Sequence, residues 1–178
     1  LGLTFSSPLI ARLGARNTAY LTVFATSAIY ALVPLMPSAL AVVPLFFIAG
    51  ALAGALEINV NLETDRHEAA LGFRIMSRAH GMWSLGFFVT AFISAGVRQL
   101  GISPAIHIAA MLVVAVIAGL VVFSGLENAP PRRDTHAGKM PLIAFPTIGL
   151  LPLCLIGAAP LHVEGAGIDW SAAYMSEV

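Results

Sequence analysis

Charge and cysteine are both scarce in this sequence. Asp, Glu, Lys and Arg make up 10% of its 178 residues, whereas soluble domains carry about 25%. So few charges exclude a nucleic-acid binder that works through a basic surface. Basic and acidic residues balance at nine each, so the net charge itself is uninformative. Cys154 is the one cysteine, so an intramolecular disulfide and a multi-cysteine metal site are excluded as well.

Motifs of soluble enzymes are also missing. The sequence has no phosphate-binding or dinucleotide-binding glycine loop and no serine nucleophile elbow. His67 and Glu68 are not followed by the second histidine that a zinc-protease helix requires. We therefore expect a protein that is not an enzyme, with no cofactor, no metal, no nucleic-acid partner and no ATP-driven pump domain.

Apolar residues, in contrast, make up 58% of the chain, and its mean hydropathy is +0.90. The stretch 17–56 has no charged residue, and its 40 residues are enough for two bilayer spans of ~20 residues each. Pro34 and Pro37 interrupt this stretch, which predicts one helix over 17–35 and a second over 39–60.

Three more apolar stretches follow the same pattern. They predict spans over 79–97, over 105–123 and from 140 into the 160s, and 1–8 resembles the end of a truncated span. The sequence thus predicts an all-α membrane protein with five complete transmembrane helices and part of a sixth. We expect it to be a fragment of a longer, multi-pass protein.

Lys and Arg are unevenly distributed among the polar segments between these spans. Segments 9–16, 61–78 and 124–139 carry two, three and three of them, whereas the turn 34–38 carries none and the turn 98–104 carries one. Eight of the nine positive charges therefore fall on alternate segments. The positive-inside rule places these three segments in the cytoplasm and the two short turns outside.

Polar residues inside the spans are the candidate functional residues. Gly50, Gly54, Glu57 and Asn61 share one helix face, where the glycines would let a neighbouring helix approach. An ionisable residue such as Glu57 is costly in a membrane and marks a functional site, unless it reaches water at the helix end.

Two other groups of polar residues have competing interpretations. His80 and Trp83 share a face and indicate either a cavity element or an interfacial anchor. The proline-rich last span leads to Glu164 and Asp169, and hydropathy alone would end that span near Val163 and leave Glu164 outside.

Four motifs carry a resemblance to the major facilitator superfamily. Segment 56–61, in which Asn61 follows Glu57 by four positions, resembles the fourth helix of fucose-permease-like transporters. Segment 75–86, with Arg78, His80 and Trp83, resembles the fifth helix of a group of largely uncharacterised bacterial inner-membrane permeases, and Glu68 matches that group's loop glutamate. Segment 164–174 is similar to its seventh helix. Segment 9–16 is similar to the loop between helices two and three, although the usual aspartate and first glycine are replaced by Ser6-Ser7-Pro8.

The resemblance implies a helical bundle of two halves. Residues 1–123 would form the N-terminal half from the end of helix two through helix six, 124–139 the central cytoplasmic loop, and 140–178 the start of the C-terminal half. Helix seven would run from about Thr147 to Tyr174, with Glu164 inside the membrane.

The resemblance also implies a function. We expect a proton-coupled secondary transporter, a symporter that moves a sugar or another small polar metabolite by alternating access in the bacterial inner membrane. Its partners would be the lipid bilayer, protons and a small-molecule substrate, and the full-length protein would be monomeric. The residues expected to act are Glu57 and Glu164 for proton coupling; Asn61, His80, Trp83 and Asp169 in the substrate cavity; and Arg12, Arg16, Glu68 and Arg78 in a cytoplasmic gate.

Three alternatives stay open at this point. The same fold could export drugs or metabolites by proton-driven efflux. An intramembrane enzyme could use His80 and Glu57. A non-transporting scaffold or sensor would tolerate neutralisation of Glu57 and Glu164.

Overall fold

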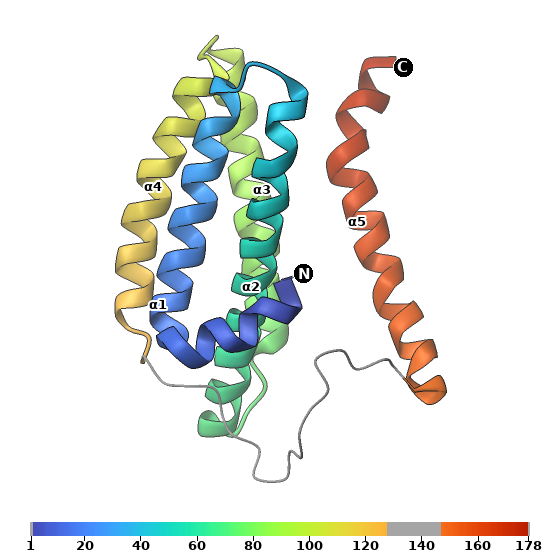
Figure 1. The fold of residues 1–178 in the computed structure, drawn as a ribbon. Coiled ribbons are helices and arrows are strands. Elements are labelled where there is room, and N and C mark those ends of the chain that lie inside the picture. The colour runs from blue at the N-terminus through green and yellow to red at the C-terminus, as the bar shows by residue number, and fades with distance from the viewer. Residues whose placement is uncertain (1, 128–146, 178) are drawn as a thin grey trace. The chain divides into compact units, whose positions relative to one another are not determined.

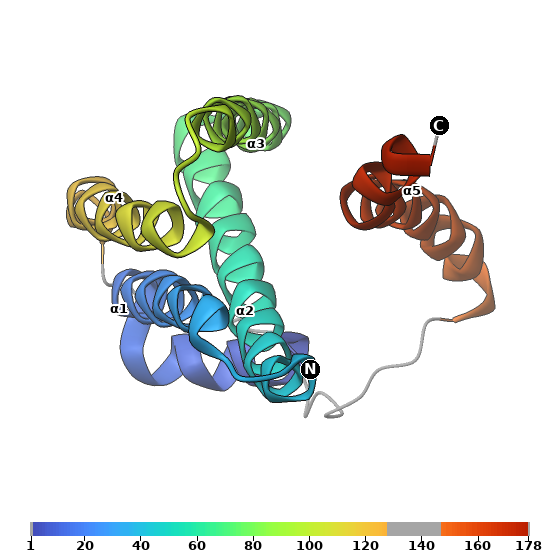
Figure 2. The same ribbon diagram turned by 90° about the horizontal axis from the view of Figure 1, so that it is seen from above.

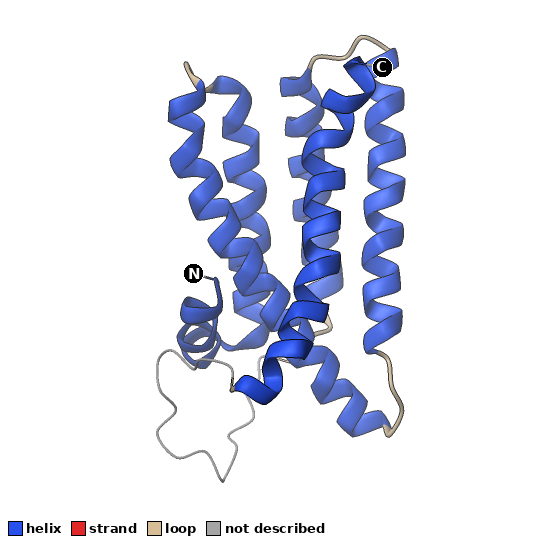
Figure 3. Cartoon of the chain, turned by 90° about the vertical axis from the view of Figure 1, so that its right-hand side faces the viewer, coloured by secondary structure: helices blue, strands red, loops and turns tan. Residues whose placement is uncertain are grey.

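The computed structural model describes residues 2–127 and 147–177, and these residues are almost entirely helical, with no strand among them (Figures 1 and 3). The long helices are α1 (Gly2–Leu32), α2 (Ala39–Leu71), α3 (Met76–Gln99), α4 (Pro104–Ser124) and α5 (Leu151–Glu177), with short 3-10 turns at Val33–Leu35 and Ile148–Leu150. Contacts divide the chain into two units, Leu1–Thr135 with α1 to α4 and His136–Val178 with α5.

Four helices of the described residues are long and apolar enough to cross a membrane. They are Ser6–Leu35, Ala39–Leu71, Met76–Gln99 and Pro104–Ser124. Their outer faces carry large apolar side chains such as Phe92 and Val121, which are 74% and 69% exposed. Such a surface suits lipid rather than water. The prediction of an all-α, multi-pass membrane protein is therefore confirmed. The fifth predicted span begins at 140, and its part over 140–146 lies outside the described residues. Its described part includes the apolar helical stretch Ile148–Ala159, which joins the second 3-10 turn to the start of α5.

The prediction that 61–78 is a polar loop between two helices is wrong, because most of this segment is helical. Helix α2 continues to Leu71 and α3 begins at Met76. Charged side chains favour water over lipid but do not break a helix, so α2 leaves the membrane without unwinding. Its 33 residues are about 50 Å long, against a hydrocarbon core of ~30 Å. Gly72, at φ 74°, ends α2 in the left-handed conformation that glycine adopts readily.

The predicted loop 9–16 is also helical. Residues 2–13 form a first helix that turns aside from the rest of α1 (Figure 1), and the two parts meet at Gly14, whose backbone is non-helical with φ 77° and ψ 167°. Only glycine adopts such a conformation at little cost. The polar segment is thus a kink between two helices, with Arg12 on one side and Arg16 on the other.

Helix α1 contacts both α2 and α4, whereas α3 contacts α2 and α4 and lies at the end of α2 that is far from α1 in the view from above (Figure 2). At the α1–α4 contact, the Tyr20 ring lies 5.5 Å from the Phe24 ring and 5.7 Å from the Phe123 ring, between centroids. The Tyr20 hydroxyl donates to the Leu120 carbonyl oxygen at 3.4 Å. Gly119 is buried beneath these rings.

Replacing Gly119 with valine should destabilise the α1–α4 contact. A Cβ atom at position 119 would lie 2.9 Å from Phe24 Cε1, so the ring or the helix must move. Overpacking of this kind costs about 1–3 kcal/mol, which thermal unfolding of the full-length protein in detergent would measure. Gly96→Val in α3 is the matched control, because a Cβ there meets nothing within 4 Å. Equal melting temperatures for the two variants would contradict the packing described here.

Candidate functional site

Helix α2 presents two different faces at its polar end. Asn59 is buried on the face that packs against α1, as its hydrogen bond to α1 shows. Glu57 and Asn61 are each two positions away, about 200° around the helix, and so lie on the opposite face. Glu57 is exposed and Asn61 is half-buried. The two predicted residues therefore share a face, and α1 does not cover it.

At Gly50, the first glycine of the stripe on this face, no neighbouring helix lies close by among the described residues. A Cβ atom added at Gly50 would meet nothing within 4 Å. Helix α1 packs against the opposite face of α2, so the expectation that Gly50 and Gly54 admit a neighbouring helix stays a prediction.

His80 and Trp83 lie in the first two turns of α3, at positions i and i+3 of one face. His80 is exposed and Trp83 is 57% exposed. The Trp83 ring stacks on the ring of Phe87, with 6.1 Å between centroids. These two residues follow the α2–α3 connection directly, whereas Glu57 and Asn61 precede it.

The four expected gate residues lie at the two polar connections of the first unit. Arg12 is exposed and Arg16 is half-buried, on either side of the Gly14 kink. The Arg78 guanidinium lies over the Phe73 ring, 6.0 Å from its centroid. Glu68 accepts backbone hydrogen bonds rather than a basic side chain. The ion pair described in this region joins Arg66 to Glu63 at 2.6 Å, one turn apart on α2.

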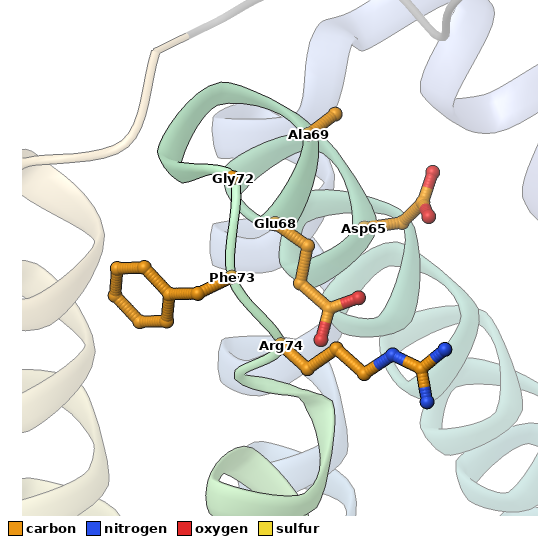
Figure 4. Close-up of a pocket in the computed structure, with 6 residues that line it drawn as sticks. All are labelled: Asp65, Glu68, Ala69, Gly72, Phe73 and Arg74. Atoms are coloured by element: carbon orange, nitrogen blue, oxygen red, sulfur yellow. The ribbon is translucent and has the colours of Figure 1, made fainter.

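A shallow pocket of about 370 Å³ lies at the connection between α2 and α3 (Figure 4). It is lined by Asp65, Glu68, Ala69, Gly72, Phe73 and Arg74. None of the predicted cavity residues lines it, and acidic and basic side chains are mixed in it. The pocket therefore belongs to the connection between α2 and α3 and is not the expected substrate cavity.

Asn59 is a buried polar residue that sequence reasoning missed. Its side chain is 1% exposed, and its Nδ2 donates to the Ala15 carbonyl oxygen of α1 at 2.9 Å. This acceptor directly follows the Gly14 kink. Asn59 Oδ1 and Thr18 Oγ1 are both buried without a hydrogen-bond partner in the described structure.

The candidates in the second unit lie in α5. Glu164 and Asp169 fall within its bounds, but their side chains lie outside the described residues. The proposed pairing of Glu57 with Glu164 therefore remains a prediction. Among the described residues, no group of three or more His, Cys, Asp or Glu side chains could hold a metal ion.

Comparison with known proteins identified two curated relatives. Over 133 residues the chain is 29% identical to an uncharacterized transporter of Sinorhizobium fredii, an alignment that covers 74% of this chain and 34% of the relative. Over 140 residues it is 29% identical to an uncharacterized MFS-type transporter of Yersinia pestis, with 79% and 35% covered. The chain thus spans about a third of the length of these relatives. No family model and no solved structure matches the chain.

Proposed function

We propose, on the premise that the chain is similar in sequence to two uncharacterized transporters, one of them MFS-type, that it is part of a secondary active transporter of the major facilitator superfamily. The observation that carries the proposal is the placement of Glu57. This carboxylate lies on an open face of a membrane-length helix that is otherwise apolar from Ala39 to Leu56. A solute pathway is the usual reason for an ionisable side chain at such a position.

The chemistry of this face fits a proton-coupled cycle. A carboxyl group that lines a cavity can take up a proton from one side of the membrane and release it to the other. Asn61, one turn further along the same face, offers an amide that can hydrogen-bond a polar solute such as a sugar. Glu164 in α5 would supply the second carboxyl group of the cycle.

The proposed orientation and location follow from the charges and from the resemblance. The Gly14 kink and the α2–α3 connection would face the cytoplasm of a bacterial cell, because Lys and Arg concentrate in these regions. His80, Trp83 and Asp169 would complete the cavity. Arg12, Arg16 and Arg78 would stand near its cytoplasmic entrance.

Transport by the full-length protein in proteoliposomes tests this function. A panel of sugars and polar metabolites is added outside while a trapped dye reports the internal pH. We expect one class of solute to acidify the lumen, and its labelled form to accumulate when an inward proton gradient is imposed. A protonophore should abolish the accumulation. Alkalinisation would indicate exchange of solute for protons, and movement of no solute by correctly folded protein would refute the proposal.

A further inference from the structure

Glu68 completes two helix ends at once. Its backbone carbonyl oxygen accepts the Gly72 N–H at 2.9 Å, which closes the last turn of α2. Its side-chain Oε1 accepts the N–H of Ile75 at 2.6 Å and the N–H of Met76 at 2.7 Å, where α3 begins. In Figure 4 the Glu68 side chain reaches from the end of α2 to the backbone that enters α3.

The first turn of a helix needs acceptors for its free N–H groups. A Ser, Thr, Asp or Asn at the N-cap normally supplies one, but the N-cap of α3 is Ile75, whose side chain cannot. Glu68 supplies the acceptor from seven positions upstream. Its negative charge also complements the positive end of the helix dipole, and charged acceptors make the stronger hydrogen bonds.

A second interaction, between Arg78 and Phe73, also links the connection to α3. The Arg78 guanidinium, in the first turn of α3, lies over the ring of Phe73. Gly72 takes the left-handed conformation that reverses the chain. Gly72 permits the reversal but does not stiffen it. The restraint on the four-residue connection comes from the hydrogen bonds of Glu68 to both helix ends and from the contact of Arg78 with Phe73.

We propose that Glu68 is a positioning residue that joins α2 and α3 into one rigid corner. It acts through backbone hydrogen bonds and not through an ion pair that opens and closes. The corner fixes the start of α3, and hence His80 and Trp83, relative to the end of α2. That this positioning of His80 and Trp83 matters to a substrate rests on the proposed function. The rigidity of the α2–α3 connection does not depend on it.

Hydrogen–deuterium exchange on the full-length protein in nanodiscs tests the corner without any transport assay. In Glu68→Ala, the amides of Ile75 and Met76 should exchange roughly tenfold faster or more, which corresponds to about 1.4 kcal/mol. Glu68→Gln keeps an acceptor oxygen but loses the charge, so its exchange should be intermediate. Asp65→Asn is the control, because it neutralises an exposed carboxylate in the same pocket.

These outcomes test the role of Glu68 at the α2–α3 connection independently of the transport function. Faster exchange confined to the start of α3, restored in part by glutamine, supports the proposal even if no solute is found. Unchanged exchange at Ile75 and Met76 in Glu68→Ala overturns it, whatever the transport activity. If alanine also exposes the middle of α2, Glu68→Gln decides: exchange at these two amides that is slower than in the alanine variant supports an acceptor role, and exchange as fast as in alanine contradicts it.

Discussion

Replacing Glu57 with glutamine is expected to abolish solute accumulation driven by a pH gradient in the full-length transporter. Glutamine keeps the size and the hydrogen-bonding capacity of the side chain but cannot take up or release a proton. Exchange of labelled for unlabelled solute at equal pH should persist, because exchange does not require a proton to be released. Gradient-driven uptake and counterflow in proteoliposomes measure the two activities separately.

The matched control for this prediction is Asp65→Asn. Asp65 is a second exposed carboxylate on α2, two turns further along and in the part of the helix that extends beyond a ~30 Å membrane core. Its neutralisation should leave accumulation at the wild-type level. If Glu57→Gln accumulates solute at the wild-type rate, Glu57 has no part in coupling. Glu164 would then be the remaining candidate.

Replacing Asn59 with aspartate is expected to be the most destabilising single change at the α1–α2 contact. The substitution replaces the Nδ2 donor with an oxygen 2.9 Å from the Ala15 carbonyl oxygen, at a position that is 1% exposed. An uncompensated buried charge costs about 3–5 kcal/mol. Thermal unfolding of the full-length protein in detergent at neutral pH should show this loss.

Two comparisons test the physical reason for this effect. Asn59→Leu has similar size and no charge, so it should cost about 1 kcal/mol, the scale of interhelical hydrogen bonds in membranes. The loss in Asn59→Asp should shrink as the pH falls, because a protonated carboxyl group can again donate to the Ala15 carbonyl oxygen. Equal stability of the two variants at neutral pH would mean that Asn59 is not buried against α1.

Hydropathy predicted the membrane helices well and their ends poorly, for a simple physical reason. An apolar stretch indicates which residues can lie in lipid, and the charge-free stretch 17–56 accordingly falls within α1, α2 and the turn between them. Charged residues indicate where a helix leaves the lipid, but they do not indicate where the helix itself ends. The residues of 61–71 are ordinary helix formers, and the true stop is the backbone conformation of Gly72.

The candidate site, too, could be predicted from the sequence only in part. Glu57 and Asn61 could be assigned to one face because helical periodicity alone determines that relation. Which face of α2 packs against α1 depends on the residues of the partner helix, and the positions of Gly50 and Gly54 did not predict it. Asn59 and Glu68 act through backbone atoms of other segments, Ala15 O and the amides of Ile75 and Met76. Such contacts depend on three-dimensional proximity, which a single sequence does not report.

The length of α2 has a mechanical consequence. From Pro44 to Leu71 the helix has no further proline and no break, so it behaves as a stiff rod. Its contact with α1 is extended and its buried residues run from Ala49 to Thr64, so the rod is held along several turns and not at one point. Leu71 lies seven residues beyond Thr64, about 10 Å away. Any change in the angle between α1 and α2 would therefore displace the aqueous end of α2 more than Glu57, which lies within the held part.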